Sequence, residues 1–229
     1  SDYGEEVRLK YRYLDLRRSK MQRNIKLRNQ IINYVRDFMN NEGFMELATP
    51  ILTAPSPEGA RDYLVPSRLH KGSFYALPQA PQQFKQLYMA SGVDKYFQIA
   101  PCFRDEDSRA DRSPGEFYQI DMEMSFATQE DVLDVISRLL FNTFDKFKPI
   151  DKSVNKLPFP SFTYKDSLES FGCDKPDLRN PLRLANVTNY FEGSGLQIFE
   201  NLIQKGAIVN CIQALKSEGK PRSFYDNLN

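Results

Sequence analysis

The clearest pattern of apolar and polar positions consists of two alternating runs, residues 96–104 and 117–124, separated by a charged loop that contains Pro114 and Gly115. Alternation with a period of two is typical of a β-strand with one face on a core. The pattern therefore predicts a β-hairpin with a long loop, and loops of this kind are often functional. In this prediction the apolar side chains of the second run point to the core: Tyr118, Ile120, Met122 and Met124.

The polar positions of the two runs share one surface if the strands pair with these faces in register. That surface would present a guanidinium, an aromatic ring, an amide and two carboxylates, from Arg104, Phe117, Gln119, Asp121 and Glu123. Arginine binds phosphate through two hydrogen bonds, a ring stacks on a base, and carboxylates bind an ammonium group or a metal ion. The pattern predicts a site for a nucleotide and an amine. The alternative is a solvated edge hairpin with alternating charges, the more common case for an average hairpin.

The rest of the chain divides into shorter helical and strand patterns. The spacing of apolar residues predicts an amphipathic helix over residues 20–41 that ends at Gly43, and another helix that begins with a capping box of Thr128 and Asp131. The intervening pattern predicts two short strands and one helix, at residues 44–47, 74–77 and 78–92. Toward the C-terminus, prolines and glycines separate short elements, and we expect a change of domain near residue 181.

The composition argues against several classes of protein. The chain has 229 residues, of which 41% are hydrophobic and 27% charged, and no apolar run approaches the length needed to cross a membrane. The three cysteines are widely separated, which predicts reduced thiols in a cytoplasmic protein and neither disulfides nor a zinc site. With His70 as the single histidine, any catalysis should rest on arginine, lysine, carboxylates and amides.

The charge is unevenly distributed along the chain. The net charge of +1 gives no general attraction to nucleic acid, but residues 8–36 contain ten lysines or arginines and one acidic residue, Asp15. Such a basic stretch is compatible with RNA contact. The alternative is the solvated face of a helix, and charge alone favours that alternative.

Two motifs resemble those of a known family. The helix over residues 20–41, followed by Gly43-Phe44, a strand and Pro50, resembles motif 1 of the class II aminoacyl-tRNA synthetases. Residues 103–106 (Phe-Arg-Asp-Glu) with Glu116-Phe117 resemble motif 2, which is a strand, a loop and a strand with an arginine at the end of the first strand.

Further segments narrow the resemblance within that class. Residues 57–68 and 76–87 resemble aspartyl-tRNA synthetases, and residues 105–112 and 171–179 resemble the bacterial or organellar type. The resemblance runs from about Glu5 to the end of the chain. Because several long motifs occur in the right order, it outweighs the solvated-hairpin alternative. The loop motif departs from that of asparaginyl-tRNA synthetases.

The resemblance implies an α+β fold, in which the antiparallel sheet of a class II synthetase is flanked by helices but incomplete. Residues 1–180 would form the first part of the catalytic domain, with motif 1 at about residues 20–52 and motif 2 at about residues 95–126. Residues 181–229 would begin a bacterial-type insertion domain. Motif 3 and the N-terminal OB-fold anticodon domain are not found in the sequence. We therefore expect a truncated chain with an incomplete site, inactive on its own.

For ATP, the resemblance implies that Arg104 binds the α-phosphate and is the catalytic residue. Phe117 would stack on the adenine, and Glu106 would lie near the same ring. Arg104 would stabilise the charge that develops as the carboxylate of the amino acid attacks the phosphate. Mg²⁺ would bridge the phosphates, and no metal ligand is expected from this chain.

For L-aspartate, the resemblance implies that Lys85 pairs with the side-chain carboxylate and that Asp121 and Gln119 receive the α-ammonium group. Gln82, three residues before Lys85 on the same helix face, would add a polar contact. Glu58 would belong to a loop that closes over the amino acid. A lysine without this context is more often a solvated helix residue, and only the surrounding motif reverses that interpretation for Lys85.

The remaining partners also follow from the resemblance. Ser108, Arg109 and Arg112 would approach the acceptor end of tRNA(Asp), which takes the aspartyl group from aspartyl-adenylate at its 3′ end. Motif 1 packs across a two-fold axis in the family, so a homodimer through residues 20–41 and Pro50 is expected. Two alternatives stay open: an enzyme that also aspartylates tRNA(Asn), and a non-catalytic dimerisation or RNA-binding module.

Three positions are undecided at this point. Glu123 is either a partner behind the site residues or an exposed strand carboxylate, with equal weight. Ala80 stands where many members of the family have serine, which would remove one hydrogen bond near the substrate. Gly115 resembles a one-residue addition to the motif 2 loop, which leaves the neighbouring loop contacts open.

Overall fold

The structure is a computed structural model that describes all residues except 1–2, 58, 108–113, 215–216 and 228–229. Its contacts divide the chain into two compact units, residues 1–159 and residues 160–229. This division falls earlier than the change of domain expected near residue 181. The assignment of the two parts to a catalytic and an insertion domain stays a prediction.

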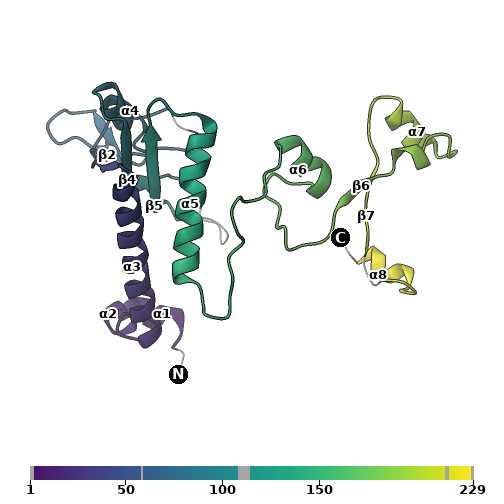
Figure 1. The fold of residues 1–229 in the computed structure, drawn as a ribbon, viewed down its shortest axis with the longest axis horizontal. Helices are drawn as coiled ribbons and strands as arrows, with labels where there is room; N and C mark the ends of the chain where they lie inside the picture. The colour runs from purple at the N-terminus through teal and green to yellow at the C-terminus, as the bar shows by residue number, and fades with distance from the viewer. Residues whose placement is uncertain (1–2, 58, 108–113, 215–216, 228–229) are drawn as a thin grey trace. The chain divides into compact units, whose positions relative to one another are not determined.

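The first unit is built on a three-stranded sheet in the order β1-β4-β5 (Figure 1). The strands β4 (Lys95–Phe103) and β5 (Glu116–Met124) form the predicted hairpin, and β1 (Met45–Glu46) runs parallel to β4. The register pairs Gln98 with Asp121, Ala100 with Gln119, and Cys102 with Phe117. Each of these pairs lies on the face that the alternation marks as polar. The two polar faces therefore coincide, and the α+β fold class is confirmed.

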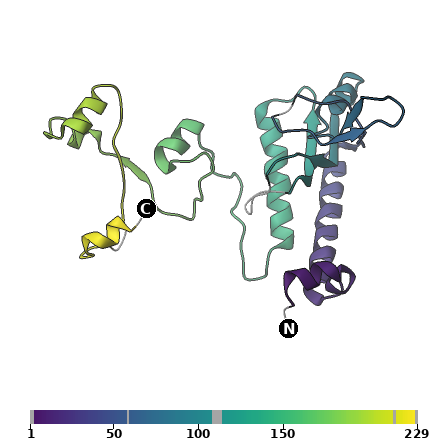
Figure 2. The ribbon, with the colours of Figure 1, turned by 180° about the vertical axis from the view of Figure 1, so that it is seen from behind.

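Two long helices cover the other face of the sheet. The helices α3 (Ser19–Asn41) and α5 (Gln129–Phe147) lie side by side in Figures 1 and 2. Their apolar stripes meet the sheet in one core cluster: Val35, Met39, Phe44, Phe97, Val135 and Leu139. Both predicted helix signals are present, since Gly43 has a φ of 82° just after α3 and Thr128 forms a capping box with Asp131.

The prediction that the whole apolar face of β5 points to the core is wrong at its loop end. Met122 and Met124 pack against the core, but Tyr118 is 53% exposed and Ile120 is 48% exposed. Core residues of the helices gather at the opposite end of the hairpin, around Phe97. The guanidinium of Arg28 lies 5.3 Å from the ring of Tyr118, so a charged group from α3 contacts this position. Alternation identifies a face but not how far a neighbouring helix covers it.

The other elements of the first unit are short. They are α1 (Glu5–Lys10), α2 (Arg12–Asp15), β2 (Leu64–Pro66), β3 (Phe74–Ala76) and α4 (Gln82–Ala90). β2 and β3 pair antiparallel, and α4 packs against β4 and β5. The helix predicted over residues 78–92 is shorter and begins after Pro81, because a proline disfavours the helical conformation of the residue before it. No helix in the described parts of the chain is long and apolar enough to cross a membrane.

The second unit consists of small elements around one antiparallel pair of strands. They are α6 (Tyr164–Phe171), β6 (Leu184–Asn186), η1 (Thr188–Tyr190), α7 (Gln197–Ile203), β7 (Asn210–Ile212) and α8 (Arg222–Asp226). Among the described residues, every fully buried apolar side chain lies in the first unit. The described contacts in the second unit include the 2.8 Å hydrogen bond from the Ser167 hydroxyl to the carbonyl oxygen of Cys173 and the ring contact of Phe191 with Phe199.

Candidate active site

A buried lysine lies against the polar face of the hairpin. The Nζ atom of Lys85, in α4, is 3.0 Å from Oδ1 of Asp121 and 3.1 Å from Oε2 of Glu123. Burial lowers the pKa of Lys85, but the hydrogen bonds and charges of Asp121 and Glu123 more than offset this, so the pKa lies above its usual value. Glu123, undecided from the sequence, is a direct partner of Lys85.

This cluster has capacity for a zwitterionic ligand. The Oδ2 atom of Asp121 is buried and finds no hydrogen-bond partner among the described residues. Leaving a buried carboxylate oxygen unpaired is costly, and a ligand cation placed there would remove that cost. Lys85 has three N–H donors, of which Asp121 and Glu123 engage two. The cluster can therefore present a carboxylate to an ammonium group and an ammonium to a carboxylate.

The strand β4 also carries buried polar side chains that are hydrogen-bonded within the protein. The Oε1 atom of Gln98 accepts hydrogen bonds from the hydroxyls of Tyr96 (2.8 Å) and Thr49 (3.0 Å). The thiol of Cys102 donates to Oε1 of Gln119 at 3.3 Å. Burial raises the pKa of Tyr96 above its usual value and that of Cys102 to about 11. Both groups therefore stay protonated and neutral at pH 7.

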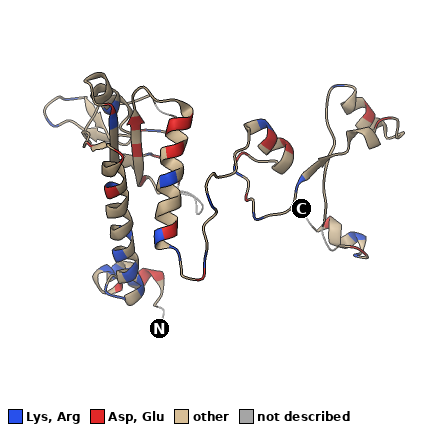
Figure 3. Cartoon of the chain, viewed as in Figure 1, with Lys and Arg blue, Asp and Glu red and all other residues tan. Residues whose placement is uncertain are grey.

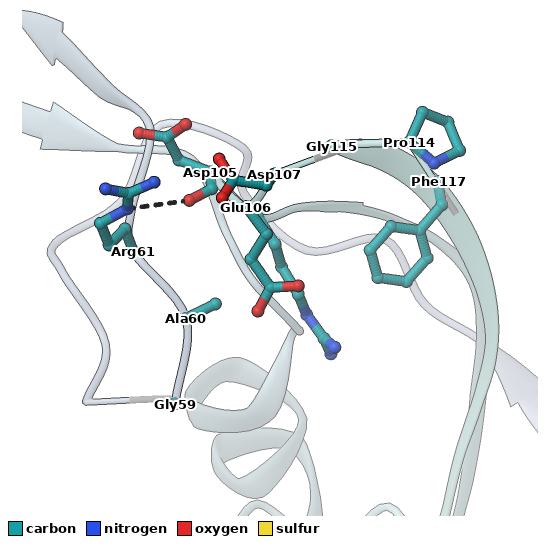
Figure 4. Close-up of a pocket in the computed structure, with 10 residues that line it drawn as sticks. Gly59, Ala60, Arg61, Asp105, Glu106, Asp107, Pro114, Gly115 and Phe117 are labelled. Atoms are coloured by element: carbon teal, nitrogen blue, oxygen red, sulfur yellow. Dashed lines mark hydrogen bonds between the residues drawn. The ribbon is translucent and has the colours of Figure 1, made fainter. Parts of the chain in front are cut away.

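A cavity of about 550 Å³ opens on the same face toward the hairpin loop. Its volume lies within the range typical of small-molecule sites. The guanidinium carbon of Arg104 lies 5.1 Å from the ring centre of Phe117, so these two groups lie together at the cavity. Figure 4 shows Ala60 and Arg61 across the cavity from Phe117. The lining consists of Gly59, Ala60, Arg61, Arg104, Asp105, Glu106, Asp107, Pro114, Gly115 and Phe117.

The wall opposite the hairpin contains residues that sequence reasoning missed. Nε of Arg61 donates to the carbonyl oxygen of Asp105 at 3.1 Å, and the Asp105 amide donates to the carbonyl oxygen of Arg61 at 2.9 Å. Gln79, which is 1% exposed, bonds the backbone of Ala60. Gln79 lies in an irregular segment, where periodicity carries no signal. The available signal was a polar side chain among apolar and proline residues.

The structure brings together most of the predicted site residues that it describes. Arg104, Glu106 and Phe117 line the cavity, and Lys85 contacts Asp121 on the same face of the hairpin. Gln119 accepts the hydrogen bond from the Cys102 thiol. Gln82 is half-buried in the first turn of α4, three residues before Lys85. Four predicted residues lie outside the described residues: Glu58, Ser108, Arg109 and Arg112.

The basic stretch of the sequence forms one region of the first unit. Figure 3 shows lysines and arginines gathered on α1, α2 and the N-terminal part of α3. The first turn of α3 has no acidic residue, so these charges add to the positive end of the helix dipole.

The described residues form no cage for a metal ion. Within them, no group of three or more histidine, cysteine, aspartate or glutamate side chains is placed to hold one. Asp105, Glu106 and Asp107 do line the cavity. Mg²⁺ is commonly held by one or two carboxylates together with phosphates and water, so these residues suit an ion that arrives with a nucleotide.

The hairpin is backed by two helices, and an arginine and an aromatic ring lie at a charged cavity on it, so the first unit is an α+β domain with a polar site on one face of its sheet. The sequence model of the family described as tRNA synthetases class II (D, K and N) matches residues 4–213. The chain belongs to this family.

Individual relatives agree with this assignment. An aspartate–tRNA(Asp/Asn) ligase of Rickettsia bellii is 60% identical over 227 residues, which are 99% of this chain and 37% of the relative. The protein of the same name from Wolbachia pipientis wMel is 61% identical over 225 residues, 98% of this chain and 37% of the relative. A crystal structure described as that of an aspartyl-tRNA synthetase from Leishmania major Friedlin superposes with a TM-score of 0.55 at 28% identity, covering 64% of this chain and 28% of that one. The chain thus spans little more than a third of the length of the curated relatives.

Proposed function

We propose that the protein carrying this sequence is an aspartate–tRNA ligase. It would activate L-aspartate with ATP to aspartyl-adenylate and transfer the aspartyl group to the 3′ end of a tRNA. The observation that carries the proposal is the buried Lys85–Asp121 pair beside a cavity with Arg104 and Phe117 on the same hairpin face. The names of the relatives support the choice of amino acid.

ATP would bind in the cavity. Arg104 binds the α-phosphate through two hydrogen bonds from its guanidinium group and stabilises the charge that develops there. Phe117 stacks on adenine, and Glu106 lies beside the base. Mg²⁺, when bound with the nucleotide, would supply charge neutralisation between phosphates. Asp105 and Asp107, which share the cavity lining, could add carboxylate contacts to that ion.

Aspartate would bind at the Lys85 cluster. Its α-ammonium group pairs with Asp121, whose Oδ2 is buried and unpaired among the described residues, and with Gln119. Its side-chain carboxylate pairs with the ammonium of Lys85, with Gln82 as a neighbouring contact. Asp121 and Glu123 keep Lys85 in its charged form, and its third N–H would donate to the anionic side chain of aspartate. Glu58 would close over the bound amino acid.

The nucleic-acid partner would meet the motif 2 loop. Ser108, Arg109 and Arg112 would contact the acceptor end of tRNA(Asp), chiefly through phosphates. The protein would act in the cytoplasm as a homodimer that buries α3 and Pro50 at a two-fold interface. Exposed apolar side chains on α3, Ile25 and Leu27, support an interface there.

A second candidate is an enzyme that aspartylates both tRNA(Asp) and tRNA(Asn). It is favoured by one observation, since the relatives at 60% and 61% identity carry both tRNAs in their name. The described residues supply the amino-acid and nucleotide sites, which the two candidates share. A comparison of tRNA substrates is therefore what separates them.

The test is aspartate-dependent ATP–pyrophosphate exchange, followed by aspartylation of tRNA(Asp) and tRNA(Asn), both with the complete protein. We expect exchange with aspartate and none with asparagine. Arg104→Lys keeps the charge but loses the bidentate hydrogen bonding to the phosphate, and should lower kcat/KM by about 100-fold. Arg68→Lys, an exposed arginine elsewhere in the first unit, is the matched control. Exchange driven by another amino acid, or an unaffected Arg104→Lys variant, would contradict the proposal.

A further inference from the structure

Gln79 is a buried glutamine whose side-chain amide pairs with a peptide. Its Oε1 atom accepts a hydrogen bond from the amide of Ala60 at 3.2 Å, and its Nε2 atom donates to the carbonyl oxygen of Ala60 at 2.9 Å. Nε2 also donates to Oδ1 of Asp62 at 2.5 Å. A primary amide has two N–H donors, and here both are used on one short segment. Gln79 thus bonds both backbone groups of Ala60, as a paired strand residue would.

The same segment is held from its other side by the motif 2 loop. Arg61 and Asp105 exchange two hydrogen bonds, of 3.1 Å and 2.9 Å. The ring of Tyr63 packs on Gly115 so closely that a Cβ atom at that glycine would lie 2.4 Å from the Tyr63 hydroxyl. Residues 60–63 are therefore fixed between Gln79 and the loop that carries the nucleotide-binding residues.

The fixed segment is also a wall of the cavity. Ala60 and Arg61 line it opposite Phe117, as Figure 4 shows, whereas Gln79 itself is not among the lining residues. Gln79 precedes α4 by three positions, so the segment that holds the wall also leads into the helix that carries Lys85. A change at Gln79 would reach the nucleotide through Ala60 and not by lost contact with it.

We propose that Gln79 is a positioning residue that holds residues 60–62 as a preformed wall of the nucleotide cavity and thereby sets the affinity for ATP. This inference rests on the proposed function, in which the cavity binds ATP. A preformed wall spares the ligand the free energy of ordering it. Loosening the wall raises KM for ATP, while a saturated enzyme reacts at nearly the same rate.

Two variants of the complete protein test this inference. Gln79→Glu is isosteric and keeps an acceptor for the Ala60 amide, but it places a carboxylate oxygen against the Ala60 carbonyl and the Asp62 carboxylate. Gln79→Met removes all three hydrogen bonds. We expect KM for ATP in the exchange reaction to rise about tenfold in both variants, with kcat changed by less than about threefold. The amide of Ala60 should exchange its hydrogen faster in Gln79→Met.

A rescue and a control make the result specific. In the double variant Gln79→Glu/Asp62→Asn, the new side-chain amide at position 62 donates to the carboxylate introduced at position 79, so the KM for ATP should fall back at least about threefold. Gln86→Glu makes the same chemical change on the exposed face of α4 and should leave the KM unchanged.

The outcomes separate the two proposals. A KM for ATP within twofold of wild type in both variants would overturn the role of Gln79. An unchanged rate of hydrogen exchange at the Ala60 amide in Gln79→Met would overturn it as well. Lower kcat with normal KM would indicate a loss of folded enzyme only, and would also overturn it. If the wild-type protein shows no aspartate-dependent exchange, the proposed function fails. Calorimetric ATP affinity of the same variants then decides the role of Gln79 independently.

Discussion

The two strands of the hairpin are paired along their whole length, yet they differ sharply in burial. β4 lies between β1 and β5, and Tyr96, Phe97, Gln98, Ala100 and Cys102 are all buried. β5 pairs with one strand within the described part of the sheet, and its residues are half-buried or exposed. β1 flanks β4 only at Tyr96 and Phe97, whereas β5 has no second neighbour among the described residues and keeps accessible groups.

Because of this difference in burial, the two strands have different roles in the candidate site. On β4, the polar side chains Gln98 and Cys102 form hydrogen bonds within the protein and so fix the shape of the sheet. On β5, Asp121 and Phe117 direct functional groups toward the cluster and the cavity. We infer that substitutions on β5 change ligand binding most, and that substitutions on β4 change stability most.

The largest expected effect is at Asp121 on β5. Asp121→Asn keeps the shape but removes the charge that faces Lys85 and, in the proposed function, the substrate ammonium. An ion pair at about 4 Å is worth about 4 kcal/mol at an effective dielectric constant of about 20, so kcat/KM for aspartate should fall by about 10³-fold. The measurement is aspartate-dependent exchange by the complete protein.

The control for Asp121 is Glu130→Gln, an exposed carboxylate in the first turn of α5. It should leave the exchange reaction unchanged. Glu123→Gln removes the second carboxylate beside Lys85, which is more exposed than Asp121, and should give an intermediate loss. A loss of less than tenfold in Asp121→Asn would mean that Lys85, and not the pair, carries the recognition of aspartate.

A smaller effect compares two isoleucines that are direct partners in the register, Ile99 on β4 and Ile120 on β5. Ile99 packs against the core, whereas Ile120 is 48% exposed. Ile99→Ala should lower the free energy of unfolding by about 3 kcal/mol, and Ile120→Ala by less than about 0.5 kcal/mol. Urea unfolding of the complete protein measures both. Equal losses would mean that a surface outside the described residues covers Ile120.

The same pair shows how far the sequence predicts this fold. Strict alternation was sufficient to predict the hairpin and which side chains share a face of each strand, because side-chain direction follows from a period of two. Whether the two polar faces coincide depends on the register of the strands, which the structure supplies. The exposure of Ile120 could not be predicted, since it depends on how far along the sheet face α3 and α5 pack. The core contacts that decide this join residues far apart in the chain, such as Val35, Phe97 and Val135.

The candidate site was predictable to a similar degree. Motif resemblance pointed to Lys85 and Asp121, and the structure brings them to 3.0 Å although they are 36 positions apart. The role of Glu123 stayed open until the structure placed it beside Lys85. Gln79 was not predicted at all, because its partners lie in an irregular loop without periodicity, and a buried amide in such a segment is recognised only from its hydrogen bonds.

The smallest effect sharpens the comparison from the β4 side and concerns pH. Burial raises the pKa of the Cys102 thiol from 9.0 to about 11, so the folded protein holds this proton over a pH range in which the unfolded chain loses it. The stabilisation is complete below pH 9.0 and is lost as pH rises toward 11, because the native state then binds more protons than the unfolded state. Cys102→Ala should therefore flatten the decline of unfolding free energy across this window by about 2 kcal/mol. Cys173→Ala, at an exposed thiol, should keep the wild-type profile. If wild type and Cys102→Ala showed the same dependence of unfolding free energy on pH, the Cys102 thiol would retain its proton no more strongly than an exposed thiol. The proposed division between a supporting strand and a ligand-facing strand would then fail at this position.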